Sequence, residues 1–203
     1  MHATNQKQRH TQRGEAQKQN LVNAAYDIIA EQGFEGLRTR EVALRAQLNI
    51  STLHYYFASK EDLVRSVAQR LLGEFKTARE PQGAPVSAVE RLEKEFSEQT
   101  SVLRRRPATY VVVMELFTRS LHDQKMRPIV QELLDSWEKH FMEVVTDGVR
   151  AGQIPADSDI LTTTKALQSL LLGRALLSLL KGTSTASDLM FAQFSRWLSS
   201  SRR

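Results

Sequence analysis

Apolar side chains recur every three or four positions through most of this 203-residue chain. That spacing is typical of helices that bury one face, whereas a half-buried strand needs strict alternation of apolar and polar residues. The run Val111-Val112-Val113 is too short, and too embedded in helical spacing, to indicate a strand. We therefore predict an all-α fold of about nine helices.

Residues that start or stop helices divide this pattern. Ser59 and Ser87 each open a capping box, and Gly33 is placed to end a helix in a left-handed conformation. Thr39 and Asp157 are predicted N-caps. The helices are expected over residues 16–32, 39–46, 50–57, 60–79, 87–105, 108–121, 128–151, 158–180 and 185–200.

Composition along the chain predicts an arm and two domains. Residues 1–15 are polar and carry more basic than acidic residues, so we expect a flexible arm that either solubilises the protein or neutralises DNA phosphates. A breaker-rich segment, Glu80 to Pro85, separates the domains. The first domain covers residues 16–79 and the second covers residues 85–203.

The stretch 38–57 reads as two short helices joined by a tight turn. Ile50, Leu53 and Phe57 form the apolar side of the second helix, which leaves Ser51, Thr52, His54 and Tyr55 on its other faces. These four side chains can form hydrogen bonds, and none of them is acidic. A helix of this kind can enter the major groove without repelling phosphates, so the stretch predicts a helix-turn-helix. The alternative is an ordinary helix pair with a solvated polar face.

The string T-R-E-V-A-x-x-A-x-L-x-x-S-T-L-x-Y-Y-F-x-S-K-E-D-L, from Thr39 to Leu63, resembles the DNA-binding domain of the tetracycline-repressor (TetR) family. The resemblance covers about residues 17–67. Gln47 stands where the family usually has glycine, and His54 stands where it usually has tyrosine. The first difference implies a slightly different turn, and the second changes one expected phosphate contact.

The helix-turn-helix and the resemblance together give a set of predicted DNA contacts. We expect groove contacts from Ser51, Thr52 and Tyr55. Contacts with phosphates or the groove edge are expected from Thr39, Arg40, His54, Tyr56 and Lys60.

Bulk composition narrows the class of protein. The formal charge of +5 favours a polyanionic partner, and the absence of cysteine excludes disulfides, thiol catalysis and cysteine-based zinc sites. No apolar leader or membrane span is indicated, since Lys165 and Arg174 interrupt the most apolar stretch, 160–180. We expect a cytoplasmic protein with no metal and no cofactor.

The last two predicted helices are apolar on more than one side, which one domain cannot cover alone. We predict a homodimer built on a four-helix bundle, with both helices buried in a monomer as the alternative. The interface residues expected are Leu170, Arg174, Leu177, Phe194 and Trp197.

Aromatic and methionine side chains in the middle helices form either plain core or a ligand cavity. The TetR resemblance implies a small ligand in this domain, and these residue types indicate a largely apolar one, of unknown identity. The candidate lining residues are Tyr110, Met114, Phe117, His122, Trp137, His140 and Phe141.

We therefore predict a dimeric transcriptional repressor that binds a palindromic double-stranded DNA operator and is released by a small effector. Three alternatives remain. One is a ligand-independent or activating DNA-binding regulator, and another is an all-α enzyme that uses the cavity as its active site. The third is a helical adaptor that binds only proteins, which would leave the acid-free face of residues 51–56 without a role.

Overall fold

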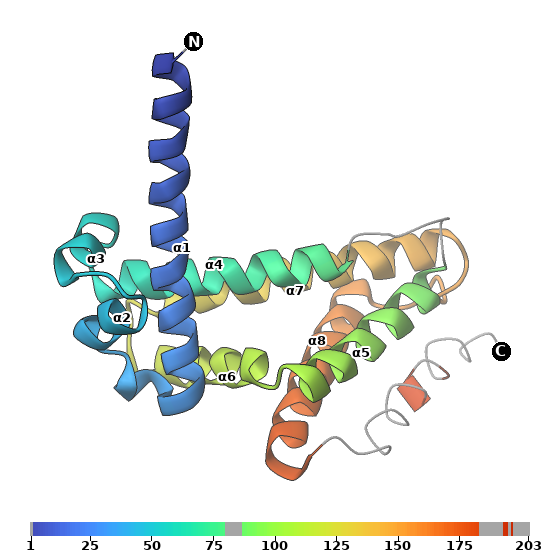
Figure 1. Cartoon of the computed structure of the whole chain (residues 1–203). Helices are drawn as coiled ribbons and strands as arrows, with labels where there is room; N and C mark the ends of the chain where they lie inside the picture. Colours follow the sequence, from blue (N-terminus) through green and yellow to red (C-terminus); the bar gives the residue numbers. More distant parts are fainter. Residues whose placement is uncertain (1, 80–86, 183–192, 195, 197–203) are drawn as a thin grey trace. The chain divides into compact units, whose positions relative to one another are not determined.

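The computed structural model describes residues 2–79, 87–182, 193, 194 and 196, without the side chains of residues 2–11 and 76–79. Within these residues the chain forms eight α-helices and no strand, as the apolar spacing predicts (Figure 1). None of these helices has the length and apolar character needed to span a membrane. The helices are α1 (His2–Gly36), α2 (Thr39–Arg45), α3 (Ile50–Tyr56), α4 (Lys60–Arg79), α5 (Ala88–Arg105), α6 (Ala108–His122), α7 (Arg127–Arg150) and α8 (Ile160–Lys181).

Contacts divide the chain into two compact units that do not follow the predicted boundary. Unit 1 contains Met1–Leu71 and Val111–Val130, and unit 2 contains Leu72–Tyr110 and Gln131–Arg203. The division therefore falls inside α4, and most of α6 belongs with the helix-turn-helix. The predicted hinge, 80–85, lies outside the described residues.

Unit 1 is organised around α1, against which α2 and α3 pack (Figure 1). Leu21, Ala25 and Ile28 are fully buried and lie on one face of α1, as helical spacing requires. Gly33 has a φ of 68° and interrupts the helix, after which Phe34 is a buried anchor. The left-handed glycine predicted at this position is confirmed.

The start of α1 differs from the prediction. The helical backbone begins at His2 and not near Ala16, so it includes the residues predicted as a flexible arm. Residues 2–20 contain no proline and a single glycine, Gly14, and they are rich in Gln, Lys, Arg and Ala. Such residues favour a helix once a neighbouring segment has nucleated it.

After α1, most predicted helix starts are confirmed, and two predicted N-caps, Thr39 and Asp157, are corrected. Ser59 caps α4 through the Asp62 N–H at 3.1 Å, and Ser87 forms a complete capping box with Glu90. The Ser87 backbone N–H, which donates to the Glu90 carboxylate, lowers the pKa of that carboxyl. The N-cap of α2 is Arg38, because Thr39 is already its first helical residue.

Unit 2 is held together by α5, α7 and α8. Asp159, and not Asp157, caps α8 by accepting from the Thr162 N–H at 3.1 Å. Gln99 in α5 donates to the Leu171 carbonyl of α8 at 2.7 Å, in addition to the apolar packing between these helices. Trp137 of α7 is fully buried in this core. The predicted ninth helix lies almost wholly outside the described residues.

Candidate nucleic-acid interface

Three backbone hydrogen bonds of 2.9–3.0 Å close the turn between α2 and α3. They run from the N–H groups of Ala46, Gln47 and Leu48 to carbonyls of α2. Gln47 has a φ of 56° and is the only non-glycine residue with positive φ among those described. The turn therefore uses the left-handed conformation that glycine adopts most easily, with a glutamine in that place.

Asn49 fixes the first turn of α3. Its side-chain oxygen accepts from the backbone N–H of Thr52 at 2.7 Å and from the Thr52 hydroxyl at 2.8 Å. The hydroxyl that was predicted to read DNA is thus engaged within the cap. Thr52 can still present its methyl group to the methyl of thymine, and its hydroxyl oxygen can still accept a hydrogen bond from a base.

Two apolar anchors orient the rest of α3. Leu53 and Phe57 are 1% and 2% exposed, so they hold one side of the helix in the core of unit 1. On the other side Ser51 and His54 are exposed, and Tyr55 is 82% exposed. A large aromatic side chain with so much exposed surface, on a helix without an acid, is suited to contact with a partner.

Tyr56 belongs to a different set of contacts. Its hydroxyl donates to the Gln17 side-chain oxygen at 3.2 Å, and its ring packs edge-on against Tyr55 with centroids 5.0 Å apart. The structure therefore assigns Tyr56 a structural link between α3 and α1. Sequence reasoning missed Gln17, whose only signal was the unbroken run of helix-forming residues before it.

A groove of about 710 Å³ separates α3 from the N-terminal part of α1. It brings together residues of the predicted arm and three predicted reading residues. Its lining is Arg13, Gly14, Glu15, Gln17, Asn49, Ser51, Thr52, Tyr55 and Tyr56. Arg13 of α1 therefore lines the same groove as the three predicted reading residues, and contact of the arm with DNA phosphates stays a prediction.

Lys60 lies at the first turn of α4, where a cation and free backbone N–H groups can receive a phosphate. Its ammonium lies 4.4 Å from the centre of the Phe34 ring, and the Arg119 guanidinium lies 4.9 Å from the same ring. Partial burial, with the nearby charge of Arg119, lowers the pKa of Lys60. Thr39 and Arg40 lie in the first turn of α2, and Arg40 is exposed.

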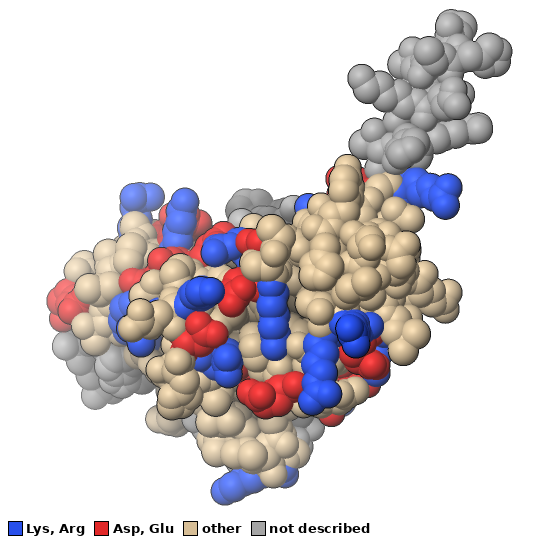
Figure 2. Space-filling model, turned by 90° about the vertical axis from the view of Figure 1, so that its left-hand side faces the viewer, with Lys and Arg blue, Asp and Glu red and all other residues tan. Residues whose placement is uncertain are grey.

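Positive and negative side chains are mixed on the side of the molecule that lies on the left in Figure 1. Figure 2 shows Lys and Arg side chains interspersed with acidic ones, next to a broad area without charge. A protein with one continuous basic surface binds DNA mainly through phosphates, without regard to sequence. The mixed pattern gives more weight to individual contacts at α3, such as those of Ser51 and Tyr55.

The predicted ligand-binding residues are only partly brought together. Tyr110 and Trp137 line a small cavity of about 40 Å³ in unit 2, and His140 hydrogen-bonds Glu95 beside it. Phe141 is fully buried core. Met114, Phe117 and His122 belong to unit 1, and His122 is exposed, so the prediction that it lines a cavity is wrong.

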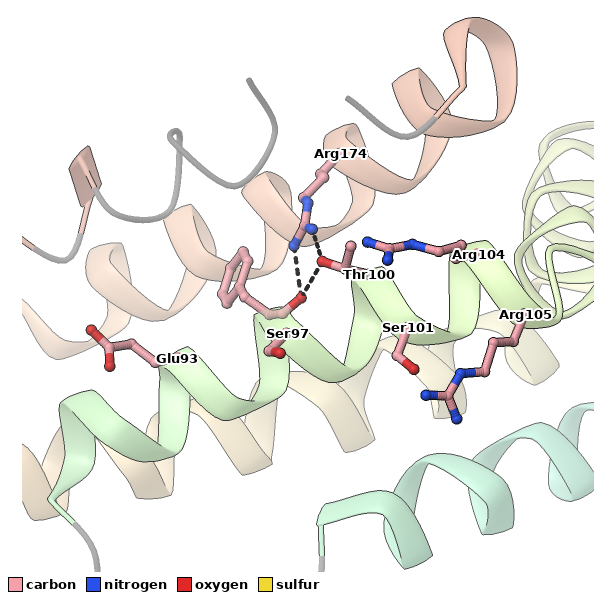
Figure 3. A pocket seen from close by; sticks show the side chains of 8 residues that line it. Glu93, Ser97, Thr100, Ser101, Arg104, Arg105 and Arg174 are labelled. Atoms are coloured by element: carbon pink, nitrogen blue, oxygen red, sulfur yellow. Dashed lines mark hydrogen bonds between the residues drawn. The ribbon is translucent and has the colours of Figure 1, made fainter. Parts of the chain in front are cut away.

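Arg174 corrects the predicted dimer interface. It is 3% exposed, and its guanidinium donates to the Phe96 carbonyl of α5 at 2.8 Å and to the Thr100 hydroxyl (Figure 3). It therefore joins α8 to α5 beside a depression of about 510 Å³ that Arg104 also lines. Leu170 is half-buried and Leu177 is 45% exposed, while the predicted Trp197 lies outside the described residues. Phe194 is half-buried.

No group of three or more His, Cys, Asp and Glu residues that could hold a metal ion occurs in the part of the chain that the structure describes.

Two family models together match most of the chain. Residues 21–67 match "Bacterial regulatory proteins, tetR family", and residues 88–201 match "BetI-type transcriptional repressor, C-terminal". The first match contains α2, the turn and α3, and the second alone covers more than half of the chain.

Individual relatives are more distant. The fatty acid metabolism regulator protein of Bacillus subtilis is 25% identical over 142 residues, which are 69% of this chain and 72% of that protein. The transcriptional dual regulator CecR of Shigella flexneri is 44% identical over 59 residues, 29% of this chain and 26% of that protein. The fold is similar to the transcriptional regulator FadR of Bacillus subtilis, solved in complex with stearoyl-CoA. Its TM-score is 0.77 at 19% identity, over 91% of this chain and 99% of that one.

Proposed function

The chain belongs to the TetR family of bacterial transcriptional regulators, and we propose that it is a homodimeric repressor that a small ligand releases from a two-fold symmetric operator. The observation that carries this proposal is the acid-free face of α3, where Ser51, His54 and Tyr55 are exposed above two buried anchors. The protein acts in the cytoplasm, where bacterial DNA lies, and it has no enzymatic activity of its own.

In this proposal α3 lies in the major groove and reads bases with Ser51, Tyr55 and the methyl group of Thr52. His54 contacts the groove edge. Phosphates are bound by Arg40 and Lys60, at the first turns of α2 and α4. Thr39 and Tyr56 contribute less directly to DNA binding. The Tyr56 hydroxyl is already hydrogen-bonded to α1.

The dimer forms through α8. Leu161, Leu176, Leu177 and Leu180 are 45–72% exposed on this helix, which is more apolar surface than an isolated helix face usually leaves in water. A second copy of the same face would cover them, and a two-fold pair of reading helices would match a palindromic operator.

The effect of a ligand bound in unit 2 can reach unit 1 through the backbone segments that connect the two units. The chain crosses from one unit to the other at three places: after Leu71, after Tyr110 and after Val130. A ligand that binds unit 2 more tightly in one arrangement of these crossings than in another shifts the population of DNA-binding dimers. Tight binding is not enough for release, because a ligand with equal affinity for both arrangements leaves the population of DNA-binding dimers unchanged.

Two experiments test this function. The first is selection of bound fragments from genomic DNA with the purified protein, which gives the operator and its symmetry. The second compares the double variant Thr52→Ala/Tyr55→Ala with Thr118→Ala/Leu121→Ala, a control that removes a threonine and a large side chain at the same spacing on α6. We expect only the first variant to lose specific operator binding. The thermal unfolding curves of both variants should match that of the wild type. Wild-type affinity in the first variant would overturn the assignment of α3.

An activator or a ligand-independent regulator would read DNA in the same way. The position of the operator relative to the promoter, which the genomic selection provides, distinguishes repression from activation.

A further inference from the structure

The small cavity of unit 2 has a largely apolar lining. Aromatic side chains come from three helices: Phe75 from α4, Tyr110 from α6 and Trp137 from α7. Two aliphatic side chains, Val102 and Leu171, also line it. The cavity measures about 40 Å³, against roughly 30 Å³ for one molecule in liquid water. It therefore has room for one small polar group.

Two buried polar atoms of this lining have no hydrogen-bond partner in the described part of the chain. They are the side-chain oxygen of Gln99, a residue 3% exposed, and the indole nitrogen of Trp137, a residue 0% exposed. Buried polar atoms are normally paired, because an unpaired one loses its hydrogen bonds to water without replacement. A group that occupies the cavity can be the partner of both atoms.

The two atoms have opposite hydrogen-bonding roles. The amide nitrogen of Gln99 donates to the Leu171 carbonyl at 2.7 Å, which fixes the amide so that its oxygen is the acceptor left over. The Trp137 indole can only donate. The partner must therefore donate one hydrogen bond and accept another. An ammonium has no acceptor and a carboxylate has no donor, whereas a hydroxyl has both on one oxygen atom.

The charged residues of the lining already have partners. Glu95 is hydrogen-bonded to His140 of α7, and Glu98 pairs with Lys94 of the same helix at 3.7 Å. Both carboxylates are also half-buried, so water reaches them. The two neutral atoms are thus the groups that an occupant of the cavity has to satisfy.

We propose that this cavity receives a hydroxyl group of the effector, so that the ligand is an uncharged hydroxyl compound with an apolar body. The hydroxyl donates to Gln99 Oε1 and accepts from the Trp137 indole N–H, and the carbon atoms next to it contact the rings of Phe75 and Tyr110. This assignment rests on the proposed release by a ligand, and it adds one polar group to the largely apolar ligand that the sequence predicts.

A water molecule is the alternative occupant, since it also donates and accepts within a similar volume. A ligand hydroxyl reproduces both hydrogen bonds of such a water, so the exchange loses neither of them. Burial of the attached carbon atoms against the aromatic rings then favours the ligand. Phe75 and Val102 are half-buried, so the lining reaches the surface of unit 2 at these side chains, and the rest of the ligand can extend past them.

The position of the cavity suits a ligand that alters DNA binding. Three lining residues lie close in sequence to the places where the chain passes between the units. Phe75 comes soon after Leu71, Tyr110 is itself a boundary residue, and Trp137 comes soon after Val130. A ligand held by these side chains contacts each of the three segments that continue into unit 1.

The test is calorimetric titration of the full-length protein with four related probes, without DNA. The first, 2-phenylethanol, carries the hydroxyl. The others are (2-fluoroethyl)benzene, which has nearly the same shape but no O–H donor, phenethylamine as its hydrochloride, which only donates, and phenylacetate, which only accepts. We expect 2-phenylethanol to bind at least about tenfold more tightly than each of the others, because each of them leaves one or both buried atoms unpaired. Equal or tighter binding of another probe, or no binding of 2-phenylethanol, overturns the proposal.

Nuclear magnetic resonance locates the head group. The chain has two tryptophans, so the protein shows two indole N–H signals, and Trp197→Phe identifies the one that belongs to Trp137. We expect a nuclear Overhauser effect between this indole proton and the methylene next to the hydroxyl of 2-phenylethanol. Its absence with the probe bound would place the probe elsewhere and overturn the site.

Variants test the two hydrogen bonds. In Gln99→Leu and in Trp137→Phe the preference for 2-phenylethanol over the fluoro compound should fall about tenfold. Gln168→Leu is the matched control, since Gln168 is also buried, at 7% exposed, and its amide also donates to a carbonyl of a neighbouring helix, that of Leu134. It lies outside the cavity lining, so the preference should stay unchanged. An equal effect of Gln99→Leu and Gln168→Leu overturns the site.

Operator binding is measured separately, by fluorescence anisotropy with and without 2-phenylethanol. The proposed function fails if the purified protein selects no operator, whatever the probes show. Binding of 2-phenylethanol that leaves operator affinity unchanged supports the cavity and contradicts its part in release. Release of the operator by an acyl-CoA, without any binding of 2-phenylethanol, supports the proposed function and overturns the cavity assignment.

Discussion

The carboxylate of Glu115 in α6 accepts a hydrogen bond of 2.9 Å from the backbone N–H of Phe34, immediately after the left-handed Gly33. A Cβ at Gly33 would lie 3.2 Å from the same carboxylate oxygen, so glycine leaves space for this approach. Arg119, one turn further along α6, pairs with Glu35 at 3.4 Å and covers the Phe34 ring. These contacts make α6 part of the DNA-binding unit.

This relationship predicts that Glu115→Ala destabilises unit 1. The partly buried Phe34 N–H would lose its acceptor, which costs about 1–2 kcal/mol of free energy of unfolding. Glu115→Gln keeps an acceptor oxygen in the same place and should lose less than half as much. Urea denaturation followed by circular dichroism measures both. Equal losses in the two variants would show that the carboxylate acts only through its charge.

A second prediction concerns the turn before the reading helix. Gln47 has a φ of 56°, a conformation that costs a residue with a Cβ roughly 1–2 kcal/mol, whereas glycine loses roughly 0.5–1 kcal/mol through its greater freedom in the unfolded chain. Gln47→Gly should therefore raise the free energy of unfolding, by about 0.5–1 kcal/mol. Gln47→Ala is the control, since it removes the side chain but not the strain. A Gln47→Gly protein no more stable than Gln47→Ala would mean that the turn is not strained.

The sequence predicted best those features that depend on residues close to one another in the chain. The start of α5 follows from Ser87 and Glu90, which satisfy each other within one turn. The exposed and buried faces of α3 follow from the spacing of Leu53 and Phe57.

What the sequence did not predict depends on distant residues. Glu115 and Phe34 are 81 positions apart, and nothing in the local pattern around either residue indicates the other. For the same reason α6 was assigned to the second domain. Arg174 was assigned to the dimer interface together with leucines of the same helix, but its guanidinium reaches carbonyl and hydroxyl acceptors of α5. Periodicity identifies a helix face without identifying what covers it.

A third prediction separates stability from DNA affinity at Lys60. Its pKa is lowered, first by burial, so the protonated form opposes folding below the folded-state pKa, and stability rises as the pH passes upward through it. Lys60→Met keeps an unbranched apolar side chain against Phe34 and removes the charge. The free energy of unfolding at pH 7 should therefore be unchanged or slightly raised.

The same variant should bind every DNA sequence less tightly. The slope of log K against log salt should decrease by about 0.9 for each subunit, the value for one lost phosphate contact. Lys125→Met is the matched control, since it removes an exposed lysine that pairs with Glu61 at 3.8 Å, also in unit 1. If Lys60→Met leaves the salt slope unchanged, Lys60 contacts no phosphate.

The last prediction tests the α8 face that we assign to the dimer. Leu177 and Leu180 are 45% and 72% exposed and lie one turn apart, so two glutamates there would place four charges in a two-fold interface. Because both positions are exposed within the subunit, Leu177→Glu/Leu180→Glu should change the subunit's own fold little. Sedimentation velocity should then show a monomer at concentrations where the wild type is a dimer. Leu121→Glu, at a leucine 70% exposed on α6, should stay dimeric. A double variant that sediments as a dimer would place the interface on another face.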